Sequence, residues 1–245
     1  MSDSVILIPT YNEKGNIGRM IKKVFSLEKD FHILVIDDGS PDGTAQIVKD
    51  LQKQYEGRLF IEERSGKLGL GTAYIHGFRW ALKRDYEYIF EMDADFSHNP
   101  DDLIRLYHAC HTGGGDMSVG SRYIKGGGVD NWPKDRILMS YFASVYVRLI
   151  TWLPVADTTA GFVCYTRKVL ETMDLDKIKF VGYAFQIEMK YATWQMGFKI
   201  KEVPIVFTDR VIGDSKMSPG IFKEAIQGVW MMRIKSFGSS YKRDV

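Results

Sequence analysis

Short apolar runs alternate with longer amphipathic stretches through the first half of the chain. The runs at residues 5–8 and 33–36 contain only aliphatic side chains, which is typical of strands covered on both faces. Strands that alternate with helices predict βαβ units, right-handed crossovers and a mostly parallel sheet of the α/β class. The expected strands span residues 5–8, 33–36, 58–62, 86–92 and 116–120, and the expected helices span residues 15–27, 42–55, 71–83 and 101–111.

The second half carries two longer apolar patterns with helical spacing. Residues 134–153 predict a long helix, and residues 221–237 predict a second helix with basic residues nearby. Such helices pack partly on a sheet, and an amphipathic helix is also suited to lie in a bilayer interface. Between them we expect a strand at residues 203–207. The polar, glycine-containing stretch that follows it predicts a mobile loop able to close over a ligand.

Polar motifs follow four of the predicted strands, at the point where each strand ends. In open α/β sheets, ligands bind beyond the carboxyl ends of the strands, so these motifs mark the expected site. They are Pro-Thr-Tyr-Asn-Glu at 9–13, Asp-Asp-Gly-Ser-Pro-Asp-Gly at 37–43, a polar stretch at 64–71 and Asp-Ala-Asp at 93–95. Carboxylates from three strands are therefore expected to converge on one edge of the sheet.

Asp93 and Asp95 lie at the end of one predicted strand. Because successive side chains of a strand point to opposite faces, these two carboxylates project to the same side. Like charges so close repel each other unless a cation lies between them. Hard oxygen ligands suit Mg²⁺ or Mn²⁺, bound together with substrate phosphates. The alternative is a solvated turn, since Asp and Asn favour turns and Asn99-Pro100 follows.

Composition and charge exclude several classes of function. The chain has 245 residues, of which 45% are hydrophobic and 26% charged, as is ordinary for one or two globular domains. A net charge of +2 gives no general case for nucleic acid binding. The two cysteines lack metal-ligand spacing, which favours a reduced, intracellular protein. We expect no signal peptide and no membrane span, which needs ~18 apolar residues.

Two common nucleotide-binding motifs do not fit. Gly69-Leu-Gly71 lacks the third glycine of a dinucleotide-binding fingerprint and follows the third strand instead of the first. Ser65-Gly-Lys67 is followed by Leu68, whereas a Walker phosphate loop requires Ser or Thr at that position.

The ordered motifs together resemble inverting glycosyltransferases of family 2 with the GT-A fold. The motifs that carry this resemblance are those at 9–13, at 35–42 (Val-Ile-Asp-Asp-Gly-Ser-x-Asp) and at 93–95. Three later motifs resemble the polyprenyl-phosphate (dolichyl-phosphate) mannosyltransferases: Gly-Ser-Arg-Tyr at 120–123, Asp-Thr-Thr-Ala-Gly-Phe at 157–162 and Arg-x-x-Gly-x-Ser-Lys at 210–216. Some family members carry Gln where this chain has Ser97, so we expect water to fill that metal-ligand position.

The resemblance implies a role for each matching position. A metal would be held by Asp95 and Asp93, and catalytic roles fall to Asp95, Arg122, Arg210 and Lys216. Carboxylates suit the nucleoside because ribose hydroxyls and guanine N–H groups are donors, and Arg and Lys suit phosphate oxygens. Arg136 could instead cap a helix start. The implied substrate-binding set is Pro9, Tyr11, Glu13, Ile36, Asp38, Asp93, Ala94, Asp95, Arg122, Arg136, Ser140, Asp157, Arg210 and Lys216.

The acceptor determines how much acid–base chemistry is needed. A hydroxyl acceptor requires a general base, whereas a lipid phosphate is already anionic near neutral pH. Positioning and charge neutralisation can then carry the reaction. We therefore expect direct in-line attack by a phosphate oxygen on the anomeric carbon, with inversion. Asp157, Gln186 and Glu188 are expected to contact sugar hydroxyls, although Glu188 could instead be an exposed charge on a helix.

These expectations combine into a metal-dependent enzyme that moves mannose from GDP-mannose to a polyprenyl monophosphate. Residues 1–217 would form the GT-A domain, with a nucleotide half at 1–122 and an acceptor half at 123–217, and residues 218–245 an amphipathic helix and tail. The enzyme would be cytoplasmic and peripheral to a membrane, alone or with a membrane-protein partner. Two alternatives stay open: a glucosyl- or other glycosyltransferase that uses a UDP-sugar, and a nonenzymatic subunit that binds nucleotide sugars.

Overall fold

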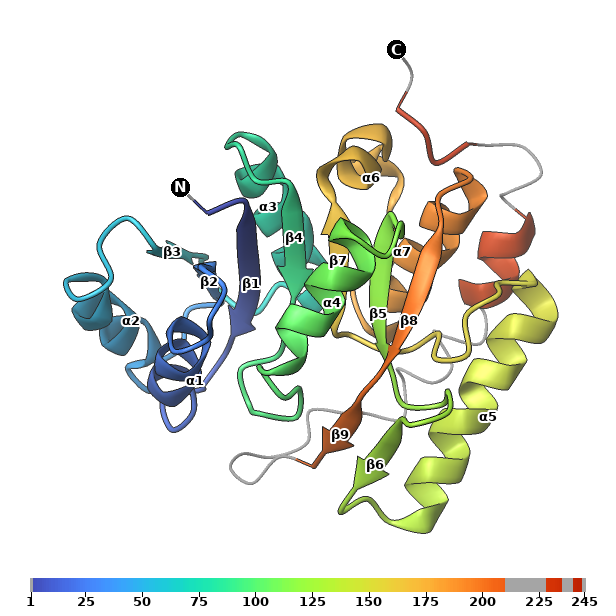
Figure 1. Cartoon of the computed structure of the whole chain (residues 1–245), viewed down its shortest axis with the longest axis horizontal. Coiled ribbons are helices and arrows are strands. Elements are labelled where there is room, and N and C mark those ends of the chain that lie inside the picture. The colour runs from blue at the N-terminus through green and yellow to red at the C-terminus, as the bar shows by residue number, and fades with distance from the viewer. Residues whose placement is uncertain (1, 210–227, 235–239, 244–245) are drawn as a thin grey trace.

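The computed structural model of the chain describes residues 2–209, 228–234 and 240–243. In this part of the chain a seven-stranded sheet runs through the centre of the molecule (Figure 1). Every strand runs in the same direction except the fifth in spatial order, which is antiparallel to both neighbours. The expected α/β class with a mostly parallel sheet is therefore confirmed. In spatial order the strands are β3 (Leu59–Glu63), β2 (His32–Asp37), β1 (Ser4–Thr10), β4 (Tyr88–Glu91), β7 (Val163–Thr166), β5 (Met117–Ser121) and β8 (Ile200–Pro204).

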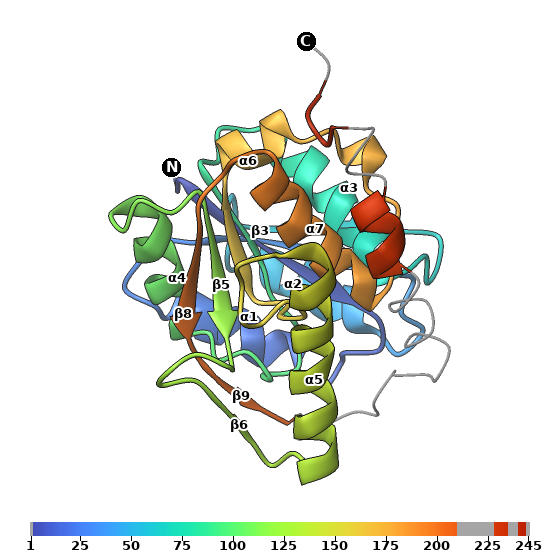
Figure 2. The same cartoon turned by 90° about the vertical axis from the view of Figure 1, so that its right-hand side faces the viewer.

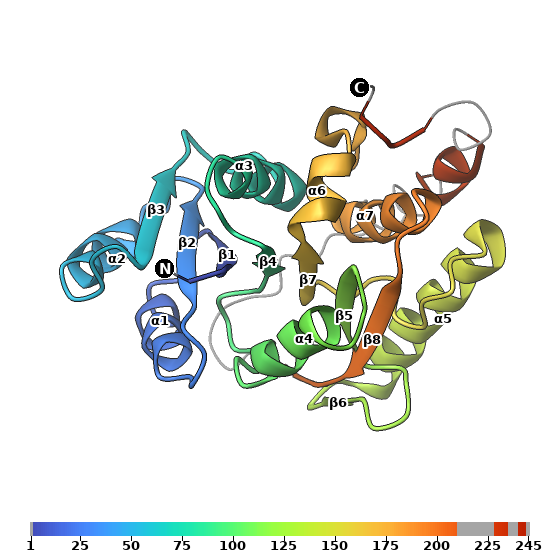
Figure 3. The same ribbon diagram turned by 45° about the horizontal axis from the view of Figure 1, so that its top comes forward.

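Helices cover both faces of this sheet (Figure 3). One face is covered by α1 (Ile17–Phe25), α2 (Thr44–Gln52) and α4 (Asp102–His111), whose apolar residues join one hydrophobic cluster. The opposite face is covered by α3 (Leu70–Leu82), α6 (Arg167–Thr172) and α7 (Tyr183–Gln195), whose apolar residues join the other. Every strand and helix expected in the first half is present, with ends that differ by a few residues.

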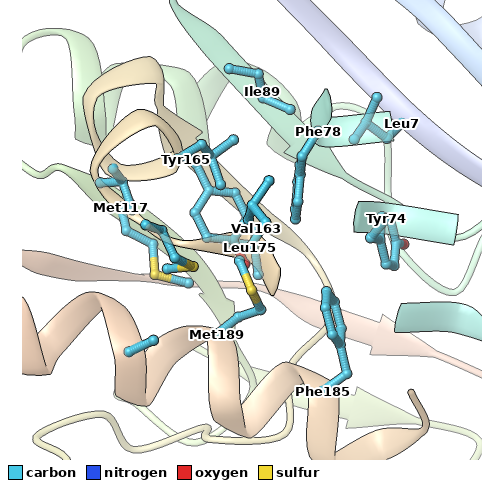
Figure 4. Packing of buried hydrophobic residues seen from close by; sticks show 14 of the residues in the cluster. Leu7, Tyr74, Phe78, Ile89, Met117, Val163, Tyr165, Leu175, Phe185 and Met189 are labelled. Carbon is cyan, nitrogen blue, oxygen red and sulfur yellow. The ribbon is translucent and has the colours of Figure 1, made fainter. Parts of the chain in front are cut away.

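The cluster under α3 and α7 is rich in aromatic side chains (Figure 4). Tyr74 of α3 stacks on Phe185 of α7, with ring centroids 5.9 Å apart. Helix α3 packs closely on β1 at Gly77, where an added Cβ would lie 2.8 Å from a methyl carbon of Leu7. Close helix–strand packing of this kind holds the carboxyl end of β1 in a fixed position.

The expected single strand at residues 203–207 is wrong, because the chain changes sheets within it. Strand β8 ends at Pro204, and β9 (Val206–Thr208) pairs with β6 (Gly128–Asp130) in a separate two-stranded sheet. Ile205 joins the two sheets: its N–H donates to the carbonyl of Ser121 and its carbonyl accepts from Gly128. The second sheet therefore extends the molecule beyond the carboxyl ends of β5 and β8.

Three further elements complete the second half. The expected long helix is α5 (Lys134–Thr151), which stands at one end of the sheet (Figure 2), and a short 3-10 helix spans Leu175–Lys177. Of the expected helix at 221–237, the described residues 228–234 are helical. No helix in the described part of the chain has the length and apolar content needed to span a bilayer.

Candidate active site

The strand order reverses at the centre of the sheet, between β1 and β4. The chain moves from β1 outward to β2 and β3, then returns to the other side of β1 as β4. In α/β sheets such a switch point leaves a crevice beyond the carboxyl ends of the two strands, where ligands bind. Residues 9–13 and 93–95 lie at or just beyond these ends, so the fold brings two of the predicted motifs to one crevice.

Residues 93–98 follow β4 and form a loop, called the acidic loop below, whose conformation is fixed by hydrogen bonds. The backbone N–H of Asp93 donates to Nδ1 of His98 at 3.2 Å, and the N–H of Ser97 donates to Oδ1 of Asp95 at 3.1 Å. Phe96 lies in the left-handed region with φ 64°, a strained conformation for a bulky residue that is often found at functional sites. The carbonyl of Ser97 accepts from Thr208 of β9, which ties the loop to the second sheet.

The oxygen donors of this loop suit a divalent metal that also binds substrate. The described residues contain no group of three or more His, Cys, Asp and Glu side chains that could hold a metal ion. A Mg²⁺-type site built from one or two carboxylates, water and phosphate needs no third protein ligand. Asp95 is buried, and the buried hydroxyls of Ser97 and Tyr74 have no hydrogen-bond partner in the described structure. The donor set therefore fits a hard cation completed by ligand oxygens.

His98 is a site residue that the sequence analysis missed. Its ring is buried, stacked on Phe162 with centroids 4.8 Å apart and in edge contact with Phe207. Burial lowers the pKa of His98 to about 4, against an opposing effect of the nearby Asp95 charge. The imidazole is thus neutral at pH 7, and because Nδ1 accepts the Asp93 N–H, the proton lies on Nε2. A lone His after an acidic motif gave no sequence signal for this role.

The carboxylate of Asp37, the last residue of β2, supports the loop that follows the strand. Asp37 is almost fully buried and accepts hydrogen bonds from the Thr10 and Ser40 hydroxyls at 2.8 and 2.6 Å, and from the Ser40 N–H at 2.8 Å. These bonds join the ends of β1 and β2. Glu13 accepts from the side chain of Asn16 at 3.1 Å, and its N–H donates to Thr44, so its loop is also locally braced.

Two predicted nucleoside contacts have positions that the sequence did not indicate. Asp38 is paired with the buried guanidinium of Arg64, at 2.6 Å from Nε. The side chain of Ile36 is fully buried in the core beside α3, which leaves only its backbone to contact a ligand.

Lys67 lies 5.3 Å from the centre of the Tyr11 ring. Pro9 is half-buried and Ala94 is buried at the same edge.

Arg122 and Asp157 form a buried ion pair. Nε and Nη2 of Arg122 donate to the two carboxylate oxygens of Asp157 at 2.7 Å, and the Arg122 N–H donates to the same carboxylate. Asp157 is fully buried, and the pairing with Arg122 holds the pKa of its carboxyl below the usual value in spite of burial. The described contacts of Asp157 hold Arg122 in place, and the expected contact of Asp157 with a sugar hydroxyl stays a prediction.

Arg122 also lies among aromatic rings and a polar group of residues 123–209. Its guanidinium is 5.1 Å from the ring of Tyr123 and 5.6 Å from the rings of Trp132 and Phe207. Nη2 donates to the hydroxyl of Thr159 at 2.8 Å. The fixed position of the guanidinium suits a role in binding an anion, since it needs little reordering.

Arg136 stands in the first turn of α5 and reaches the end of β9. Its Nη1 lies 3.1 Å from Oδ1 of Asp209, and its guanidinium stacks 3.9 Å from the centre of the Trp132 ring. Arg136 is thus paired with a carboxylate and does not cap the helix in the described structure. Ser140 lies on the same helix beside the hydroxyl of Tyr123. Arg210 and Lys216 lie outside the described residues.

Helix α7 places its polar side chains in the interior, contrary to expectation. Glu188 is buried and accepts from the N–H groups of Lys179 and Phe180 at 2.8 and 3.0 Å, so the alternative of an exposed charge is wrong, and the sugar contact stays a prediction. The amide of Gln186 donates to Glu91 at 2.6 Å below the acidic loop. These contacts mark both residues as internal supports.

Large apolar side chains are exposed along one side of α5. The exposed fractions are 61% for Phe142, 71% for Leu149 and 68% for Trp152, and Leu138 continues the same helical spacing. Helical residues 228–234 extend the surface, with Arg233 lying 4.3 Å from the ring of Trp152. We call the exposed apolar residues of these two segments the α5 face: Leu138, Met139, Tyr141, Phe142, Leu149, Trp152, Trp230, Met231 and Ile234.

Comparison with known proteins identifies the family. Residues 5–174 match the family described as glycosyl transferase family 2. The chain belongs to glycosyl transferase family 2. This family 2 chain is 43% identical over 223 residues to the polyprenol monophosphomannose synthase of Mycolicibacterium smegmatis, which covers 91% of this chain and 84% of that protein. It is 42% identical to the undecaprenyl-phosphate mannosyltransferase of Micrococcus luteus, with 91% and 90% covered.

Solved structures agree on the fold of this family 2 chain. Glucosyl-3-phosphoglycerate synthase from Mycobacterium tuberculosis, in complex with Mn²⁺, uridine diphosphate and glucosyl-3-phosphoglycerate, superposes with a TM-score of 0.67. The alignment covers 96% of this chain and 79% of that one, at 15% sequence identity. A likeness at this identity concerns the architecture alone, and it confirms the expected GT-A fold.

Proposed function

We propose that this family 2 chain transfers mannose from GDP-mannose to a polyprenyl monophosphate and releases GDP. The observation that carries the proposal is the site itself: an acidic loop at the switch point of the sheet faces an acceptor half that holds a pre-positioned arginine. Two relatives that match over 91% of this chain are named for mannose and for polyprenyl or undecaprenyl phosphate. The names and the site chemistry point to the same reaction class.

The donor half, residues 1–122, would bind the nucleotide in the crevice between β1 and β4. Asp95 and Asp93 would hold a divalent ion, Mg²⁺ or Mn²⁺, which when bound neutralises diphosphate charge as a Lewis acid. His98 fixes the backbone of Asp93 through its neutral Nδ1, and the buried hydroxyl of Ser97, which has no hydrogen-bond partner in the described structure, would bind a water on the metal. Tyr11, Glu13 and the backbone near Asp38 would border the nucleoside.

The acceptor half, residues 123–217, would position the lipid phosphate. A phosphate monoester is anionic at neutral pH, so its oxygen can attack the anomeric carbon without a general base. The new bond forms from that oxygen to the anomeric carbon, the bond from that carbon to the GDP oxygen breaks, and the configuration inverts. Arg122 would draw the two anions together, held by Asp157, with Arg136, Ser140, Arg210 and Lys216 as the further polar groups of this half.

The α5 face would bring the enzyme to the membrane that carries the acceptor. Its residues are large, apolar and exposed, and basic Arg148 and Arg233 lie on the same two segments. An amphipathic surface of this composition lies in the headgroup region of an anionic bilayer. We propose a peripheral enzyme on the cytoplasmic face, where the nucleotide sugar would be available, either alone or beside a membrane-protein partner.

A transfer assay tests the proposal and its alternatives together. Purified protein with Mg²⁺ or Mn²⁺ and polyprenyl phosphate is incubated separately with labelled GDP-mannose, UDP-glucose and UDP-N-acetylglucosamine, and label is counted in the lipid phase. We expect label from GDP-mannose alone. Label from a UDP-sugar alone would replace the donor. Nucleotide binding without any transfer to lipid would favour the nonenzymatic binding subunit.

A further inference from the structure

A fully buried lysine lies beneath the site and has no part in the reaction proposed above. Lys190 of α7 is 0% exposed. Its Nζ donates to the carbonyl of Ala160 at 2.5 Å, to the carbonyl of Gln186 at 3.0 Å and to Oε1 of Gln186 at 3.4 Å. Removing an ammonium group from water costs several kcal/mol before its partners compensate. Stability alone therefore gives no reason to place a cation here instead of an apolar side chain.

The contacts of Lys190 continue to the acidic loop. The series of hydrogen bonds continues through Gln186, whose Nε2 donates to Glu91 at 2.6 Å. Glu91 is itself fully buried, accepts from the hydroxyl of Tyr165 and is the last residue of β4, two positions before Asp93. A fully connected buried network of this kind rigidifies the groups that it joins.

The other end of the network holds the loop at residues 157–162. Three successive parts of this loop contact three parts of the site: Asp157 and Thr159 hold Arg122, Ala160 accepts from Lys190, and Phe162 stacks on His98. His98 in turn accepts the N–H of Asp93. The 157–162 loop thus connects Arg122 with the acidic loop, beside a second connection through Phe207, whose ring lies near both Arg122 and His98.

We propose that Lys190 is a positioning residue for glycosyl transfer, which sets the 157–162 loop and, through it, the distance between Arg122 and the acidic loop. It touches neither substrate nor metal and acts through Ala160 and Gln186. This inference rests on the proposed function, since the reacting phosphates are assumed to lie between these two parts. A misplacement of about 1 Å in such a site can lower the rate about 100-fold.

The test compares Lys190→Met with a matched change on the same helix. Met keeps an unbranched apolar side chain, one atom shorter, without the charge of Lys. Thr193→Val is the control, because Thr193 is equally buried and its hydroxyl bonds only to the carbonyl of Met189 within α7 in the described structure. For Lys190→Met we expect kcat to fall about 10- to 100-fold with the KM for GDP-mannose within about threefold. Thr193→Val should keep both values. An unchanged kcat in Lys190→Met overturns the proposal, as does an equal loss in both variants.

A double-mutant cycle separates positioning from a general loss of structure. If Lys190 acts through Arg122, the loss caused by Lys190→Met should be much smaller in an Arg122→Lys background, because the coupled group is already displaced. Fully multiplicative losses would contradict the proposal. If Lys190→Met does not fold, Lys190→Gln, which keeps a donor but not the reach to Ala160, takes its place in the same cycle.

Hydrogen exchange gives a readout that does not depend on the reaction. Lys190→Met should raise amide exchange in residues 157–162 and at Arg122 at least about tenfold, relative to Thr193→Val. If the wild-type protein transfers no sugar, the proposed function is wrong, but the exchange measurement still tests the structural role of Lys190. Unchanged exchange in the 157–162 loop would remove the role of Lys190, whatever the activity.

Discussion

The two sides of the site are built in different ways. On the donor side, the side chains that shape the edge of the sheet bond within one loop or to the end of the adjacent strand, as Asp37 does with Ser40 and with Thr10. On the acceptor side, the decisive bonds join distant parts of the chain, such as Arg122 to Asp157 and Arg136 to Asp209. The donor side is therefore built from the ends of consecutive strands, whereas the acceptor side joins segments that have at least two other elements between them.

This difference has a functional meaning under the proposed reaction. A nucleotide diphosphate offers the same hydrogen-bonding groups in every donor, and short braced loops at a switch point can bind it. A lipid phosphate must be brought to the donor from a membrane, and a site assembled from β5, β9, α5 and the 157–162 loop can respond to that surface. Breaking each side should therefore have a different signature.

Asp95→Asn tests the donor side with the largest expected effect. Loss of one carboxylate at the proposed metal site should lower transfer by about 10³-fold, since a Lewis acid supplies several kcal/mol of charge stabilisation. Circular dichroism should remain unchanged. Asp42→Asn is the matched control. Asp42 lies in the loop after β2, at the same edge of the sheet, but its carboxylate accepts hydrogen bonds from the Lys14 N–H and the Thr44 hydroxyl. Full activity in Asp95→Asn would remove the metal role of this loop.

Asp157→Asn tests the long-range construction of the acceptor side. The change leaves the buried guanidinium of Arg122 without its carboxylate, and breaking a buried pair in this way costs about 3–5 kcal/mol. Urea unfolding at pH 7 should show this loss. A change of free energy below about 1 kcal/mol would mean that Arg122 is not held mainly by Asp157.

His98 contacts both sides of the site, and its protonation should make the free energy of unfolding depend on pH. Its folded pKa of about 4 lies below the ordinary value of about 6.5, so between these values the unfolded chain binds more protons. The wild type should therefore gain stability from about pH 4 to 6.5, by as much as ~3 kcal/mol. His98→Phe keeps the ring and lacks this gain.

The comparison of wild type with His98→Phe removes an opposing effect. Burial raises the pKa of Glu91 to about 7, so the Glu91 carboxyl lowers stability as pH rises from about 4.5 to 7. This contribution is present in both proteins and cancels in their difference. The difference in unfolding free energy should rise up to about pH 6.5 and stay constant above it. A difference that is constant over the whole range would contradict the neutral, buried imidazole.

The α5 face sharpens the comparison, because only the acceptor side should depend on a membrane. Phe142→Ser together with Leu149→Ser removes two large exposed apolar groups, each worth about 1–2 kcal/mol when it enters an apolar environment. Binding to anionic phospholipid vesicles in a sedimentation assay should weaken about 30-fold. Transfer to a short, water-soluble polyprenyl phosphate should be retained. Unchanged vesicle binding would place the membrane contact elsewhere.

Glu188→Gln should have the smallest effect. The carboxylate accepts from two N–H groups at residues 179 and 180, so its loss should cost about 1–2 kcal/mol of stability. Activity per folded molecule should not change, because the side chain supports a loop and does not face the crevice. A large rise in the KM for the nucleotide sugar at unchanged stability would support the sugar-contact hypothesis.

The sequence predicted the donor side well for a physical reason. The strand before 9–13 contains an uninterrupted apolar run, the strand before 93–95 is apolar except for Glu91, and the polar residues at their ends follow from chain order alone. The motifs that carry the family resemblance lie in the same places. The α/β class, the position of the acidic loop at the carboxyl edge of the sheet and the family were therefore accessible before any coordinates.

The acceptor side was harder to predict because its contacts are not local. Helix α7 carries Gln186, Glu188 and Lys190 in the interior, whereas charged residues on a helix usually indicate an exposed face. Nothing in the spacing of residues 122 and 157 indicates that they pair. The antiparallel strand β7, inserted between β4 and β5, creates these neighbours, and a single sequence gives no signal for that insertion.

Calorimetric titration of GDP tests the central claim most directly, because it asks whether the acidic loop binds nucleotide through a divalent ion. We predict that Mn²⁺ tightens GDP binding to the wild type by at least about tenfold, which corresponds to about 1.4 kcal/mol, and does not do so in Asp95→Asn. Equal affinity with Mn²⁺ and with a chelator, in the wild type, would contradict the account.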